Sequence, residues 1–357
     1  MLLTETVVEQ AQLLLRQRLL LNNDRYTGLT QLTQHDYRLL DCLSLLHSAE
    51  QHNVTTAMPA WLVWLINSSL TTLLSPAQLN GLGQFESAWQ LLLDLKYHQQ
   101  PAAVTTMIEQ RLQDNATPAL VWQFAARHRL ALTALLQTKL QTADLCADAL
   151  CYLGYSGQRQ LLPMLQQYCT QLSHDDTQCC AAQLAAYLLG QQSDEAGLVM
   201  TLAQTKQLTD IALMLLMIGA TDTTQARIVN YLSANEDSIG TAMRAMAFSG
   251  QLKFVPLLLE LSQQQHSAVA ALEALTVLLG ALDADALVSA GDCTAFMAGK
   301  SRRKLAGFDI DAEQLAIIWR QGNPLQRQLV ACYRFLAQPG TALVFTNVLF
   351  GAPAYEQ

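Results

Sequence analysis

The chain of 357 residues is acidic, with a formal net charge of −8, and 51% of its residues are apolar while only 14% are charged. Phosphate neutralisation dominates the affinity of general nucleic-acid binders, so this charge balance argues against a nucleic-acid partner. The longest uncharged apolar runs, residues 61–66 and 211–220, are far shorter than the ~20 residues that span a bilayer, so we expect no membrane insertion.

An apolar stripe at helical spacing predicts an amphipathic helix over residues 1–22. Acidic residues occur early in this stretch, no basic residue precedes them and no small-residue cleavage site follows. The stretch is therefore not expected to be an export signal. A second helix, rich in leucine, is expected from about Tyr26, or from Thr33, to Gln51.

A further helix is expected after Pro59, and it carries Trp61 and Trp64. Residues three positions apart share one face of a helix, so the two indoles would lie together. Core packing is the commoner role for such a pair, and an exposed aromatic anchor for a partner protein is the functional alternative. With a helical stripe over residues 85–93, these elements make up an expected N-terminal helical region, residues 1–100.

Helical repeats are expected over residues 101–285, and this range includes a transitional hairpin that contains the cluster Arg127-His128-Arg129. One phrase occurs twice: Gly-Gln, two variable residues, two apolar residues, Pro, an apolar residue and Leu, at 157–165 and 250–258. The two copies are 93 residues apart, which is three periods of 31. Weaker copies surround Gly190 and Gly219, and Gly280 closes the series. A fixed period in this range is typical of a solenoid of stacked helical hairpins.

Each glycine of this series is expected to end a helix, because glycine adopts the left-handed backbone of a helix stop without steric cost. Pro163 and Pro256 would lie in the first turn of the following helix, where a missing N–H is tolerated. Stacked hairpins bury their apolar faces against neighbours and offer an extended concave surface. The expected helices that precede the glycines are residues 146–153, 178–189, 208–218, 239–248 and 268–279.

This pattern of an Ala/Leu-rich helix, glycine turn, proline and second helix resembles the short bacterial HEAT-like repeats over residues 142–281. The resemblance implies an all-α solenoid and says little about activity. The common unit opens with an Asp and a Val-Arg pair, which this chain lacks at the expected places. Arg244 is the nearest match, so these repeats look diverged.

The remaining residues, 286–357, are expected to form a C-terminal helical cap with helices at 312–321, 325–336 and 341–350. It contains the densest basic run of the chain, Lys300-Ser301-Arg302-Arg303-Lys304. A solvated loop between helices is the commoner explanation for such a run. A docking patch for an acidic partner is the functional alternative.

A second resemblance involves the two ends of the chain. The segments that carry it are Val8-Glu9-Gln10, residues 36–52 with the sequence Tyr-Arg-Leu-Leu-Asp, residues 83–95 and the closing Ala-Pro-Ala-x-x-Gln. They look like an uncharacterised bacterial family with HEAT-like repeats in its middle, whose genes often lie in type VI secretion clusters. The resemblance implies a cytoplasmic accessory of a contractile secretion apparatus, and it supplies no catalytic residues.

No catalytic, cofactor-binding or metal-binding residue is predicted. Cys179 and Cys180 with His174, Asp175 and Asp176 collect metal-ligand types, but adjacent helical residues point about 100° apart and cannot easily close one tetrahedral site. The eight cysteines fall mostly within apolar helices, where a free thiol acts as a small hydrophobe, so a reduced, cytoplasmic protein is expected.

We therefore expect a non-catalytic scaffold or adaptor that binds protein partners. The alternative is a HEAT-fold enzyme or nucleic-acid-acting protein whose site is assembled across repeats. Self-assembly, with the first amphipathic helix exchanged between copies to give a homo-oligomer, is a third interpretation. The candidate partner-binding residues are Trp61, Trp64, Arg127, Arg129, Lys300, Arg302, Arg303 and Lys304.

Overall fold

The computed structural model describes residues 2–51, 59–66, 74, 79, 82, 85–114, 119–171, 176–291 and 303–349. These residues form an all-α, solenoid-like fold, as expected, in which the described strands are limited to one short hairpin. None of the helices in these ranges combines the length and apolar character that a membrane crossing needs.

The chain divides into two compact units, and the division differs from the expected one. Unit 1 comprises Met1–Leu132 with Phe345–Gln357, and unit 2 comprises Thr133–Val344. Unit 2 is thus inserted in sequence between two parts of unit 1. The expected boundary at residue 100 falls inside unit 1, where the helix that starts at Pro101 packs on its predecessor, and the one at residue 285 falls inside unit 2.

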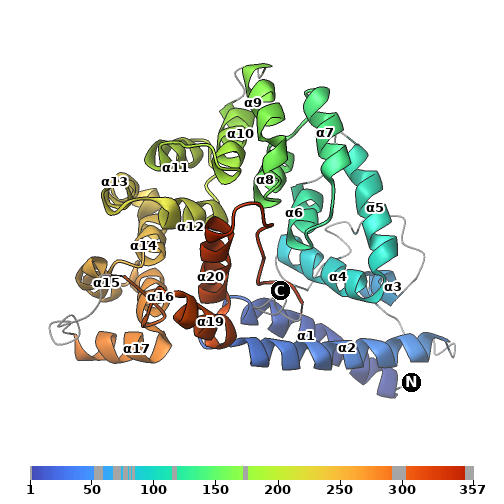
Figure 1. The fold of residues 1–357 in the computed structure, drawn as a ribbon. Helices are drawn as coiled ribbons and strands as arrows, with labels where there is room; N and C mark the ends of the chain where they lie inside the picture. The colour runs from blue at the N-terminus through green and yellow to red at the C-terminus, as the bar shows by residue number, and fades with distance from the viewer. Residues whose placement is uncertain are drawn as a thin grey trace. The chain divides into compact units, whose positions relative to one another are not determined.

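Unit 1 is built from helices that follow the predicted order (Figure 1). The first helix is confirmed, and the second starts at Leu29, between the two expected starting points. Because α4 contacts both α5 and α6, residues 101–127 belong with the helix before them. The described helices of unit 1 are α1 (Leu2–Leu21), α2 (Leu29–Gln51), α3 (Ala60–Ile66), α4 (Phe85–Gln99), α5 (Pro101–Gln113) and α6 (Ala119–Arg127).

Unit 2 consists mainly of stacked helical hairpins (Figure 1). Short 3-10 turns precede α9 (η2, Arg159–Leu161), α14 (η3, Glu236–Ser238) and α15 (η4, Leu252–Phe254). The helices of the stack are α7 (Thr133–Gln141), α8 (Ala147–Tyr155), α9 (Leu162–Gln171), α10 (Asp176–Leu188), α11 (Glu195–Gln204), α12 (Asp210–Gly219), α13 (Asp222–Ser233), α14 (Ile239–Phe248), α15 (Val255–Ser262), α16 (Ala268–Leu279) and α17 (Ala281–Ala290).

The five predicted helices before the glycines correspond to α8, α10, α12, α14 and α16, with ends shifted by at most two residues. These five helices, here called the apolar row, form the core of the stack. In α12, for example, every residue from Ala212 to Met217 is buried. A helix buried on all sides has neighbours on each face, as stacked hairpins require. Pro163 and Pro256 are each the second residue of their helix, which confirms their predicted place.

Four of the five glycines of the series have positive φ, and Gly157 and Gly250 have φ of 67° and 71°. Gly219 differs, because it is the last residue of α12 and has no positive φ. A Cβ at Gly219 would lie 2.1 Å from the Tyr187 hydroxyl oxygen, so this glycine permits a close approach of neighbouring hairpins. The repeated glycine therefore has two different structural roles: a helix stop with positive φ at four positions, and a close approach of hairpins at Gly219.

Replacing Gly157 by alanine is expected to lower the free energy of unfolding by at least ~1–2 kcal/mol, the cost of left-handed backbone for an L-residue. The added Cβ would also lie 2.0 Å from Thr341 O. Gly240→Ala, within α14, is the matched control, because a Cβ there meets nothing within 4 Å and alanine favours helix by up to ~1 kcal/mol. Chemical denaturation measures both variants, and equal stabilities would contradict the role of the turn.

The part of unit 2 after the stack contains two confirmed helices and one unpredicted hairpin. Helices α19 (Ala312–Gln321) and α20 (Pro324–Ala337) match their predicted ranges, and the strands are β1 (Lys304–Leu305) and β2 (Phe308–Asp309). The hairpin turn forms because the N–H groups of Ala306 and Gly307 donate to Val277 O and Leu278 O, at 2.7 and 2.8 Å. These bonds satisfy orphan carbonyls at the end of α16.

The prediction of a helix over residues 341–350 is wrong, because residues 341–349 are not helical. Residues 342–345 are irregular and residues 346–349 form turns. Leu343 N donates to Tyr155 O at 2.8 Å, and Gln328 Nε2 donates to Val344 O at 3.0 Å. Bonds to other helices of unit 2 thus replace the bonds that a helix of its own would make.

Helix α20 covers part of the apolar row. It packs against α12, and Gln326 Nε2 donates to Thr276 O of α16 at 2.8 Å. The charges are complementary: residues 133–290 contain 14 acidic and 6 basic residues, whereas residues 291–344 contain 4 and 7. A helix of the chain itself thus packs on part of the stack.

Candidate interaction site

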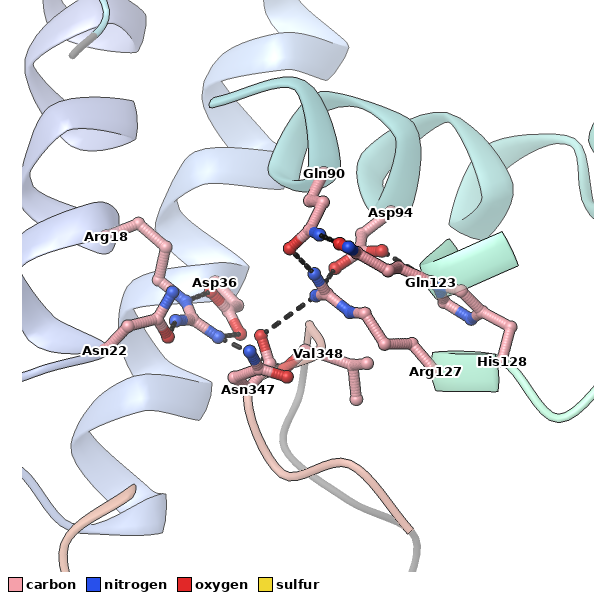
Figure 2. Close-up of polar contacts among 10 residues, drawn as sticks. All are labelled: Arg18, Asn22, Asp36, Gln90, Asp94, Gln123, Arg127, His128, Asn347 and Val348. Carbon is pink, nitrogen blue, oxygen red and sulfur yellow. Dashed lines mark hydrogen bonds and ion pairs between the residues drawn. The ribbon is translucent and has the colours of Figure 1, made fainter. Parts of the chain in front are cut away.

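The first polar feature of unit 1 is a fully buried ion pair between its first two helices. Arg18 of α1 and Asp36 of α2 are both 0% exposed. Arg18 Nε lies 2.5 Å from Asp36 Oδ1, and Arg18 Nη2 donates to Asp36 Oδ2 at 3.3 Å. Asn22, which directly follows the last residue of α1, accepts a hydrogen bond from Arg18 Nη1. The guanidinium is thereby fixed by two neighbours (Figure 2).

A second buried pair joins α4 to the end of α6. Arg127 Nη2 lies 2.5 Å from Asp94 Oδ2, and its other terminal nitrogen donates to Gln90 Oε1. His128 Nε2 lies 2.8 Å from the second oxygen of Asp94. Burial lowers the pKa of Arg127, Asp94 opposes this effect, and the positive charge of Arg18 adds to it. The two arginines therefore repel each other, and each has its own carboxylate.

Both guanidiniums also hold residues 345–349, here called the closing segment. Arg18 Nη2 donates to Val348 O and Arg127 Nη2 donates to Asn347 O, both at 3.2 Å. Figure 2 shows the segment between the two arginines, which reach it from different helices. Three of its side chains are buried: Thr346, Val348 and Leu349 are 1%, 8% and 9% exposed.

We call Arg18, Asp36, Asp94 and Arg127 the clasp. Its contacts with the closing segment are made to main-chain carbonyls, so the polar part of this recognition does not depend on side-chain identity. Charge-assisted hydrogen bonds are stronger than neutral ones, and fixed donors lose little entropy on binding. The clasp is therefore suited to hold an irregular peptide segment.

His35 lies beside the clasp on α2 and is 8% exposed. Neither ring nitrogen has a hydrogen-bond partner within the described part of the chain. Burial is the main reason that its pKa is lowered; Arg18 and Arg38 lower it further, and Asp36 opposes them. The folded protein therefore favours a neutral imidazole at this position.

Because the pKa of His35 is lowered by folding, the unfolded chain binds the proton first as the pH drops. The free energy of unfolding should then decrease as the pH is lowered past about 6.5. This group contributes at most ~1.4 kcal/mol per pH unit to the decrease. Denaturation between pH 7.5 and 5 measures the slope, which should be flatter in His35→Leu. The same change at exposed His266 is the control. An unchanged slope in His35→Leu would contradict the assignment.

Four of the predicted partner-binding residues lie in unit 1, and they have different environments. Trp61 is 1% exposed, so it packs in the core and offers no surface anchor. Trp64 is half-buried, with Lys96 Nζ 6.0 Å from its ring centroid; burial lowers the pKa of Lys96 to about 8. Arg127 is 8% exposed and belongs to the clasp, whereas Arg129 is exposed. The basic cluster is therefore split between interior and surface.

The other candidates belong to the basic run of unit 2. Arg303 forms an ion pair with Asp222, and Lys304 Nζ lies 2.9 Å from Asp309 Oδ1. Both pairs are intramolecular and partly exposed. Lys300 and Arg302 lie outside the described residues.

No metal centre is formed by the described residues. No three His, Cys, Asp or Glu side chains within the described ranges are arranged as metal ligands. Of the residues that suggested a site, Cys179 is half-buried and Cys180 is buried in α10, whereas His174 and Asp175 lie outside the described residues.

Sequence reasoning missed three of the four clasp residues. Arg18 follows Leu15 by three positions in the buried stripe of α1, and Asp36 precedes Leu39 by three in that of α2. Charged residues at core positions of amphipathic helices usually have a buried partner, so this signal was available. Asp94 gave the same signal within the apolar α4.

Comparison of the chain with protein-family models, curated proteins and solved structures found no match.

Proposed function

We propose that the protein is a non-catalytic scaffold or adaptor that binds a protein partner through unit 2. The observation that supports this proposal most is the stack of hairpins, which places exposed side chains of successive repeats on one continuous surface. Ion pairs between neighbouring repeats reinforce it: Asp194 pairs with Arg227 and Asp210 with Arg244, each at 3.1 Å. Their spacings of 33 and 34 residues are close to the period of 31, so each pair joins one repeat to the next.

The best candidate contact surface is the edge where α16 ends and α17 begins. Leu282 is 80% exposed, and Phe308 in β2 is 38% exposed. They lie in the same neighbourhood, because a Cβ at Gly307 would be 2.8 Å from Leu279 O and 3.9 Å from Asp283 Oδ2. Lys304, in the paired strand, forms an ion pair with Asp309, and Asp283 lies nearby, so this edge carries no excess of positive charge. A mainly apolar protein surface would complement the edge.

Within the resemblance described above, the partner would be a component of a bacterial contractile secretion apparatus. This assignment depends on the resemblance alone. The edge at Leu282 and Phe308 is an independent basis for partner binding, whichever machine the partner belongs to.

Affinity capture from a native bacterium, with quantitative mass spectrometry, tests the proposal. A partner should be enriched by the wild type and lost with Leu282→Asp/Phe308→Asp. Val269→Asp is the control, because Val269 is 72% exposed at the other end of α16 and should leave capture unchanged. Recovery of only background proteins, or equal recovery with all three proteins, would overturn the assignment of this edge.

A further inference from the structure

The closing segment behaves as a ligand of the rest of unit 1. The four clasp residues come from residues 18–127, and the segment follows more than 200 residues later. In sequence, the whole of unit 2 separates the ligand from its receptor. Their polar contacts include two hydrogen bonds from fixed guanidiniums to consecutive carbonyl oxygens, and their apolar contacts come from a few buried side chains.

The chain passes from unit 2 to the clasp over a very short stretch. Val344 O still accepts a hydrogen bond from Gln328 of unit 2, and Asn347 O already accepts one from Arg127 of unit 1. The anchors on either side are separate, so the segment can leave the clasp while Leu343 and Val344 keep their bonds in unit 2. Nothing in the clasp itself specifies which copy of the chain supplies the segment.

We propose that the clasp is an interaction site for a second copy of this chain, in which each copy's closing segment occupies the clasp of its partner. The second copy is the occupant that the observations favour, because the segment seated in the clasp is this chain's own. An exchanged segment makes the same contacts as the original one. Exchange of identical elements is a low-cost route to dimers for this reason.

The clasp also explains why an empty site would be disfavoured. Without the segment, two buried guanidinium groups would lose their carbonyl acceptors, and buried donors without acceptors are costly. A second copy removes this cost whenever a chain's own segment is displaced. The exchange therefore links opening of the clasp to association of two copies.

Two full-length variants with different affinity tags test the exchange. Val348→Arg places a positive charge beside Arg18, so this variant has a disabled segment and an intact clasp. Arg18→Met/Asp36→Leu removes both charges together, so that variant has a disabled clasp and an intact segment. Mixed in equal amounts, they should form a 1:1 heterodimer at least ten times more abundantly than either forms a homodimer, as measured by tandem capture and light scattering.

A peptide with the sequence of residues 345–357 provides the second measurement. Fluorescence anisotropy should show saturable binding to the Val348→Arg variant, and at least tenfold weaker binding when Arg18→Met/Asp36→Leu is added to it. Two folded variants that neither associate nor bind the peptide would overturn the proposal. Loss of cooperative unfolding in the Val348→Arg variant, without rescue by the peptide, would also overturn it, because the segment would then be an integral core element. Neither result depends on whether an adaptor partner is found.

Discussion

Arg18→Met is expected to lower the free energy of unfolding by about 3–5 kcal/mol, one of the largest effects of a single change in this protein. The substitution keeps most of the side-chain volume but leaves Asp36 as a fully buried carboxylate without its main counter-charge. It also removes the donor to Val348 O, so the closing segment loses one of its two charged anchors. Urea denaturation followed by circular dichroism measures the change.

The double variant Arg18→Met/Asp36→Leu distinguishes charge from packing. Replacement of a buried ion pair by apolar residues of similar volume is often neutral or stabilising, so most of the lost stability should return. Arg16→Met, at an exposed position of the same helix, should change stability by no more than ~0.5 kcal/mol. A double variant as unstable as the single one would show that the pair acts through its hydrogen bonds to Asn22 and Val348.

The repeat stack illustrates what local sequence can predict. Helices α14 and α16 begin and end at their predicted residues, because apolar periodicity and a stop glycine are properties of about ten to fifteen consecutive residues. Unit division and the closing segment were not predictable in this way. They depend on bonds such as Arg18 to Val348, which joins residues 330 positions apart.

The candidate site shows the same contrast between what local sequence predicts and what depends on long-range contacts. The charge of the basic cluster around Arg127 predicts a surface role. The charge of Arg127 instead lies in the interior, where it pairs with Asp94, 33 residues earlier in the chain. Periodicity could have revealed this, because Gln90 and Asp94 are four residues apart on α4 and pair with Gln123 and Arg127, four apart on α6. Matching polar positions on two helices predict a contact, whereas a count of charges does not.

Asp94→Asn is expected to be as damaging as the loss of Arg18, at about 3–5 kcal/mol. The amide is nearly the same size as the carboxylate, so the effect isolates the charge. Arg127 would remain buried beside a neutral group, and Arg18 would repel it without compensation. His128 would also lose its anionic partner at 2.8 Å.

The chain contains a matched control for this change. Asp194 pairs with Arg227 at the same spacing of 33 residues, but both side chains are 56% exposed. Solvent screening limits exposed pairs to ~0–1 kcal/mol, so Asp194→Asn should have a small effect that shrinks further at high salt. Denaturation of both variants at low and high salt measures the contrast. Similar losses at the two sites would mean that burial does not control the strength of these pairs, and the clasp would then lose its physical basis.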